Sequence, residues 1–196
     1  KIIREQEGIT KYIGGGEESF GYLPGDFVRD KDGVAAITLV AEAAAWARET
    51  MGITLYEWLQ QLYVKYGFFR EGLVNVVRKG KDGAAEIQQM MVDYRQNPPK
   101  ALLGSPIVKI LDYKTLEELD VRTGERKPIE GIDEKSNVLQ WLTEDGTKVS
   151  VRPSGTEPKI KFYFGVKTKL ESVDKFDETL AALDKKIADL AAELNL

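Results

Sequence analysis

The sequence predicts an α+β protein: a carboxyl-terminal domain of about four mainly antiparallel strands with helices packed on one face, preceded by a partial α/β domain. Apolar residues recur at spacings of 3 and 4 near the carboxyl end, which is typical of an amphipathic helix. Apolar and polar residues alternate over 138–151, around an Asp145-Gly146 pair that marks a tight hairpin turn. The predicted boundary lies near Gly67, giving domains 1–67 and 68–196.

Two helices are predicted in the first domain. Asp32 can cap an apolar helix that extends to about Glu49. Thr54 and Glu57 form a capping-box pattern, which predicts a second helix to about Tyr66. These helices and the turns before them are too few to complete a core, so we expect this domain to be partial.

Strands and helices alternate in the second domain. Strands are predicted where aromatic and β-branched residues gather or alternate with polar ones. The segment 114–135 carries many charges and few large apolar groups, which indicates a loop or an irregular excursion. The predicted strands are 68–77, 107–111, 138–142, 148–151 and about 160–164, and the predicted helices are 82–95, ended by Pro98 and Pro99, and a last one from Phe176 to Leu194.

The composition limits the chemistry that the chain can perform. It contains no histidine and no cysteine, which excludes Ser-His-Asp catalysis, disulfides and metal sites with imidazole or thiolate ligands. A net charge of −4 gives no general attraction to nucleic acid or anionic membranes, and no apolar run is long enough to span a bilayer. The chain begins at Lys1 without a signal-peptide pattern, so an excised, cytoplasmic segment is expected.

The segment from Arg152 to Pro158, Arg-Pro-Ser-Gly-Thr-Glu-Pro, has the residue types that bind phosphate. Arginine provides planar bidentate donors, serine and threonine provide hydroxyls, and glycine lets backbone N–H groups approach an anion. The alternative is a plain β-turn with a surface arginine. The whole string, continued by Lys-Ile-Lys-Phe-Tyr at 159–163, resembles the phosphate-binding loop of the phosphohexomutases, the phosphoglucomutase/phosphomannomutase family.

A second match lies at residues 15–22, Gly-Gly-Glu-Glu-Ser-Phe-Gly-Tyr. A carboxylate can accept hydrogen bonds from two adjacent sugar hydroxyls, whereas the alternative is an acidic surface turn. The segment resembles the sugar-recognition loop of the same family and stands in the same order relative to the phosphate loop. It departs from the family at Phe20-Gly21, where many members have a histidine two positions after the serine.

The resemblance implies a role for each matched residue. The sugar would be bound by Glu17 and Ser19, and the non-reacting phosphate by Arg152, Ser154, Gly155 and Thr156. Lys159 and Lys161 are explained at least as well as solvated residues and are left out of the predicted site. Glu157 is expected to face outward or to pair with a nearby base, and Asp32 is expected to cap a helix rather than bind a ligand.

The resemblance covers nearly the whole chain and implies the end of the third domain and all of the fourth domain of a four-domain enzyme. The family carries a phosphoserine in its first domain and an Asp-rich Mg²⁺ loop in its second, and neither motif occurs in this sequence. The parent would interconvert phosphosugars through that serine and a sugar 1,6-bisphosphate. This chain would bind substrate without catalytic or metal-binding residues and would be inactive without the amino-terminal domains. The alternative is a free-standing phosphate-binding or regulatory module.

Overall fold

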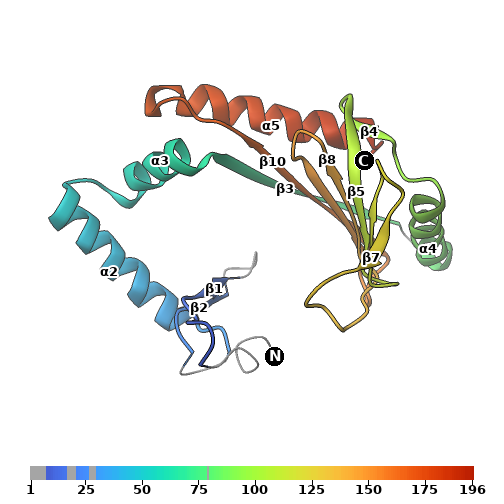
Figure 1. Ribbon diagram of the computed structural model, residues 1–196, viewed down its shortest axis with the longest axis horizontal. Helices are drawn as coiled ribbons and strands as arrows, with labels where there is room; N and C mark the ends of the chain where they lie inside the picture. Colours follow the sequence, from blue (N-terminus) through green and yellow to red (C-terminus); the bar gives the residue numbers. More distant parts are fainter. Residues whose placement is uncertain (1–7, 17–20, 27–29, 79) are drawn as a thin grey trace. The chain divides into compact units, whose positions relative to one another are not determined.

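The computed structural model describes residues 8–16, 21–26, 30–78 and 80–196 (Figure 1). The chain divides into two compact units, Lys1–Leu62 and Tyr63–Leu196. None of the described helices is both long and apolar enough to cross a membrane.

The first unit begins with a short antiparallel ribbon, in which β1 (Gly15–Gly16) pairs with β2 (Tyr22–Leu23). Helix α2 (Gly33–Met51) follows. The Asp32 carboxylate accepts hydrogen bonds from the N–H groups of Val34 and Ala35 in the first turn of α2, at 2.9 and 3.2 Å. The predicted helix cap is therefore confirmed. Gly52 ends the helix in the left-handed conformation, with a φ of 70°.

Helix α3 (Leu55–Tyr66) begins with the predicted capping box. The Thr54 N–H donates to a Glu57 carboxylate oxygen at 2.7 Å, and the Glu57 N–H donates to the Thr54 hydroxyl at 3.2 Å. The hydrogen bond from the Thr54 N–H, together with one from the Thr54 hydroxyl at 2.8 Å, lowers the pKa of the Glu57 carboxyl, since both stabilise its charged form. The reciprocal pair satisfies two backbone donors that the first turn would otherwise leave free.

In the described part of the first unit, the two helices enclose no large apolar core. Ala47 is the buried residue of α2, while Val34 and Ile37 on the same helix are 75% and 72% exposed. The Trp46 and Trp58 rings lie 5.3 Å apart between centroids, which gives the two helices one aromatic contact.

The second unit is built on an antiparallel sheet of eight strands in the order β3-β10-β9-β8-β5-β6-β7, with β4 paired to β5. The predicted α+β class is therefore confirmed, and the sheet is wider than the four or so strands expected. The strands are β3 (Phe68–Val77), β4 (Ala101–Leu102), β5 (Ser105–Asp112), β6 (Glu117–Asp120), β7 (Arg126–Pro128), β8 (Leu139–Thr143), β9 (Lys148–Pro153) and β10 (Lys159–Thr168).

Strands β6 and β7 lie within 114–135, where the charge density predicts a loop, so that prediction is wrong. Ion pairs take the place of an apolar pattern here. Glu118 on β6 contacts Lys109 on β5 at 2.7 Å and Lys127 on β7 at 3.4 Å. Such opposite-charge pairs across neighbouring strands stabilise a sheet without any alternation of apolar residues along one strand.

The core lies on one face of this sheet. Alternate residues of β10, namely Ile160, Phe162, Phe164 and Val166, are at most 1% exposed. Helices α4 (Gly80–Gln96) and α5 (Phe176–Glu193) cover this face, and α5 follows a short 3₁₀ turn, η1 (Val173–Lys175). Figure 1 shows α5 lying along β3 and β10, and both predicted helices of this unit are thus confirmed.

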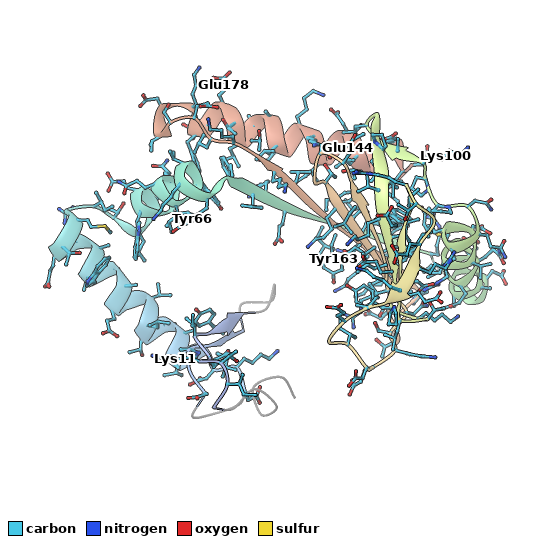
Figure 2. All side chains as sticks on the ribbon, in the orientation of Figure 1. Lys11, Tyr66, Lys100, Glu144, Tyr163 and Glu178 are labelled. Carbon is cyan, nitrogen blue, oxygen red and sulfur yellow. The ribbon has the colours of Figure 1, made fainter. Side chains whose placement is uncertain are left out.

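The opposite face of the sheet is left open by the described helices. Its side chains come from the alternate positions of each strand, which on β10 are Lys159, Lys161 and Tyr163. Tyr163 lies on the side of the sheet away from α5 (Figure 2). On β3 the same face carries Phe69, Leu73 and Val77, each about half exposed.

Candidate functional site

The predicted phosphate loop connects β9 to β10. Pro153 is the last residue of β9 and Lys159 the first of β10. The Ser154 N–H donates to the Lys159 carbonyl at 2.8 Å, which closes the loop, and the strand pairing continues from the Pro153–Ile160 pair. Because both ends of the loop belong to one antiparallel pair, the sheet holds the loop in place.

Arg152 lies on the open face of the sheet. Its neighbours Val151 and Pro153 are buried, and successive side chains of a strand point to opposite faces, so the Arg152 side chain lies opposite the core, where it is exposed. Among the described residues, no carboxylate forms an ion pair with its guanidinium. The guanidinium is therefore available to an anion.

The turn between Arg152 and Lys159 presents its hydroxyls and backbone outward. The Thr156 N–H donates to the Ser154 hydroxyl at 3.4 Å, so that hydroxyl accepts a hydrogen bond and keeps its own proton for another group. Gly155 is exposed, and a Cβ placed on it would meet no atom within 4 Å. The space beside Gly155 is therefore open to a ligand.

A hydrogen bond outside the hairpin also holds the loop. The Arg78 N–H, immediately after β3, donates to the Pro158 carbonyl at 3.0 Å. Backbone hydrogen bonds thus connect the loop to the end of β3 as well as to the β9–β10 hairpin, and β3 and β9 are the two strands that flank β10.

Lys161 is a candidate that the sequence alone left out. It is the Cα partner of Arg152 on β9 and of Asn75 on β3, so these three residues form one row across the open face. Lys161 is partly buried, and among the described residues its ammonium has no ion-pair partner. The sequence could have indicated Lys161 through two signals taken together. These are the alternation of apolar and polar residues along β10 and the register between β9 and β10 that a short connecting loop imposes.

Glu157 forms an ion pair with Lys159, which agrees with the expectation that it would pair with a nearby base. Its carboxylate contacts the Lys159 ammonium, and the Glu157 carbonyl accepts the Lys159 N–H at 2.7 Å. The Lys159 ammonium lowers the pKa of the Glu157 carboxyl, and the more distant charge of Lys161 lowers it further.

Glu17 and Ser19, the predicted sugar ligands, lie outside the described residues. The ribbon that flanks them is described. The Tyr12 hydroxyl donates to the Leu23 carbonyl at 3.1 Å, and a Cβ on Gly15 would come within 2.9 Å of the Tyr12 hydroxyl oxygen. A Cβ at this position would therefore require the Tyr12 hydroxyl to shift.

The described residues also bear on metal binding. Within 8–16, 21–26, 30–78 and 80–196, no group of three or more acidic side chains comes together in a way that could hold a metal ion. Several carboxylates of the second unit are instead engaged in ion pairs with lysine or arginine, as at Arg95–Asp112, where the two side chains lie 2.8 Å apart.

Comparison with known proteins assigns both halves of the chain. Residues 73–183 match the family model "Phosphoglucomutase/phosphomannomutase, C-terminal domain", and residues 1–66 match "Phosphoglucomutase/phosphomannomutase, alpha/beta/alpha domain III". The phosphoglucomutase of Staphylococcus haemolyticus is 32% identical over 179 residues, which cover 91% of this chain and 31% of that protein. A Staphylococcus aureus phosphoglucomutase is 35% identical over 165 residues, covering 84% of this chain and 29% of that protein.

A solved structure shows the same fold. The crystal structure of the phosphoprotein pp63/parafusin (phosphoglucomutase) from Paramecium, in an open form, aligns with a TM-score of 0.54 over 92% of this chain and 30% of that chain, at 18% identity. The chain thus spans about a third of the length of the proteins that it matches. On the strength of the two domain matches and of these relatives, the chain belongs to the phosphoglucomutase/phosphomannomutase family.

Proposed function

We propose that this chain is the substrate-binding portion of a phosphoglucomutase/phosphomannomutase that interconverts sugar 1-phosphates and 6-phosphates. The observation that carries the proposal is the loop between β9 and β10. It presents the Arg152 guanidinium, without a carboxylate partner among the described residues, beside the Lys161 ammonium on one face of the sheet. Two adjacent cations that lack counter-charges favour the binding of a dianion.

In this proposal the loop holds the phosphate that does not react. Arg152 donates two parallel hydrogen bonds to phosphate oxygens, because its guanidinium is planar and matches their spacing. The hydroxyls of Ser154 and Thr156 donate to the remaining oxygens, and the open space at Gly155 lets the backbone approach the anion. Lys161 contributes a further positive charge from β10.

The two domains then divide the recognition of the substrate. Residues 68–196 bind the phosphate, and residues 1–67 complete a sugar-binding domain in which Glu17 and Ser19 accept and donate hydrogen bonds to sugar hydroxyls. Binding energy gained at these remote groups orients the substrate and can be used to lower the barrier of the chemical step elsewhere.

The phosphoryl transfer itself is assigned to the rest of the parent polypeptide. There a phosphoserine would exchange its phosphoryl group with the sugar through a sugar 1,6-bisphosphate. Mg²⁺ bound there would stabilise the charge of the transferring group. The described residues of this chain offer no carboxylate cluster for the ion.

Titration with inorganic phosphate, followed by NMR, tests the proposal. The amide signals of Ser154, Gly155, Thr156 and Lys161 should shift together and saturate, while signals from the hairpin turn at Asp145-Gly146, at the other end of β9, should not. If the loop amides ignore phosphate, the site assignment is wrong. The reading frame upstream in the source gene distinguishes the two alternatives, because a free-standing module would have no phosphoserine loop there.

A further inference from the structure

The ion pair between Glu157 and Lys159 lies where its charges affect phosphate binding by the loop. Glu157 lies within the loop and Lys159 begins β10, and their side chains are 58% and 30% exposed. The backbone hydrogen bond between the same two residues, 2.7 Å from the Lys159 nitrogen to the Glu157 oxygen, fixes the turn that joins them. The ion pair therefore rests on a defined backbone rather than on two freely moving side chains.

This pair divides the cations of the site into two classes. Arg152 and Lys161 form no ion pair with a carboxylate of the described residues, although Lys161 acts on Glu157 from a greater distance, whereas Lys159, two positions before Lys161 on the same face, is paired with Glu157. Of Arg152, Lys159 and Lys161, only Lys159 forms an ion pair with Glu157. The other two cations are without an ion pair among the described residues that a phosphate dianion would have to break.

We propose that Glu157 is a positioning residue that withholds Lys159 from the bound phosphoryl group and so keeps the affinity of the loop moderate. This inference rests on the proposed function of the loop. In the proposed relay the bisphosphate reorients in every cycle, so the phosphate held here must leave the loop and another must enter. A third free cation would stabilise the bound state uniformly and slow that exchange without accelerating the chemical step.

A double-mutant cycle on the 196-residue chain tests the inference, with inorganic phosphate as the probe at low ionic strength. Glu157→Gln frees Lys159 and should tighten phosphate binding about fivefold. Lys159→Gln leaves the Glu157 charge bare near the anion and should weaken binding by about the same factor. The double variant removes both charges and should bind within about twofold of the wild type.

The double variant separates the inference from its closest competitor. If Lys159 contacts phosphate in the wild-type protein, the double variant loses that contact and will bind several-fold more weakly than the wild type, and the inference is overturned. Differences below about twofold for all three variants would also overturn it, since the pair would then be an ordinary surface ion pair. If wild-type Ser154, Gly155 and Thr156 amides do not respond to phosphate at all, the proposed function itself fails, which is a distinct result.

A matched pair just after the same strand provides the control. Lys169 and Glu171 follow β10 with the same spacing of two residues, at 3.0 Å, but lie at the opposite end of the strand from the loop. Glu171→Gln should leave phosphate affinity unchanged. Raising the ionic strength should shrink the affinity differences among the Glu157 and Lys159 variants, which a change in loop shape alone would not do. Thermal melts should be similar throughout, since the Glu157 side chain is 58% exposed and an ion pair of this kind contributes little to stability.

Discussion

Arg152 on β9 and Lys161 on β10 are directly opposed Cα partners on the open face of the sheet. Two like charges opposite each other destabilise an isolated strand pair, and no carboxylate among the described residues is paired with either side chain. The arrangement is unfavourable for the hairpin alone and favourable for an anion bound beside it. Unfavourable local electrostatic energy of this kind is typical of binding sites.

The first prediction concerns Arg152. Arg152→Lys keeps the charge but loses the bidentate geometry, and should weaken phosphate binding. Arg152→Ala should weaken it further, by about 2 kcal/mol, since a charge-assisted hydrogen bond is lost. Phosphate titrations of the two variants measure both effects. Neither variant should unfold, because the Arg152 side chain is exposed and the core lies on the other face.

Lys148→Ala is the control for this series. Lys148 is exposed on the same strand and the same face, four residues before Arg152 and away from the loop. Its loss should leave phosphate affinity nearly unchanged. A collapse of the fold in Arg152→Ala, together with loop amides that ignore phosphate in the wild type, would instead make the arginine structural.

The local features of this fold could be predicted because they depend on neighbouring residues. The caps at Asp32 and Thr54–Glu57 involve hydrogen bonds over two or three positions, which a sequence displays directly. The central position of β10 could not be predicted. It depends on the pairing of Phe68 with Thr168, residues far apart in the chain, and on core packing that no short pattern encodes.

The same distinction applies to the candidate site. Arg152, Ser154, Gly155 and Thr156 lie in one short string, so the sequence showed them together. Lys161 was left out because its relation to Arg152 depends on the register of β9 and β10. Strands β6 and β7 were missed because ion pairs between strands, such as Lys109–Glu118, leave no apolar periodicity to detect.

The second prediction concerns activity. This chain alone should show no measurable turnover of glucose 1-phosphate in the presence of Mg²⁺ and a sugar bisphosphate, because the sequence lacks the phosphoserine motif and the Asp-rich metal loop. A coupled assay for the 6-phosphate measures this. Conversion by protein that is free of contaminating mutase would contradict the proposed division of roles.

The third prediction concerns pH and the β8–β9 hairpin. Burial alone would raise the pKa of Asp145, but hydrogen bonds from Lys186, Thr143 and Thr147 outweigh it and lower that pKa well below its ordinary value. A carboxyl whose folded pKa is depressed stabilises the protein above its unfolded pKa, and that stabilisation is lost as the pH falls.

Asp145→Asn should therefore lower the free energy of unfolding at pH 6 by about 1 kcal/mol, a figure reduced for solvent screening of a side chain that is 40% exposed. The difference from wild type should shrink as the pH falls below about 4, where the unfolded carboxyl becomes protonated. Urea unfolding at several pH values measures this.

Asp189→Asn is the control, since it removes an exposed ion pair within α5 and should show a much smaller effect at every pH. An Asp145→Asn difference that grows towards acid would refute the argument.

The last prediction compares two helices of similar length. Helix α2 has 19 residues and one buried side chain, Ala47, whereas α5 has 18 residues and buries Phe176, Leu183 and Leu190 against the sheet. Because amide protection follows the free energy of local opening, and that energy comes mainly from buried contacts, α5 should exchange its amide hydrogens about a hundredfold more slowly than α2. Helix propensity favours the opposite order, since α2 is rich in alanine. Hydrogen exchange followed by mass spectrometry on the intact chain decides between the two. Equal protection of α2 and α5 would mean that α2 is held by contacts beyond those of the described residues, and that the helices before Gly67 are as stable as the sheet domain after it.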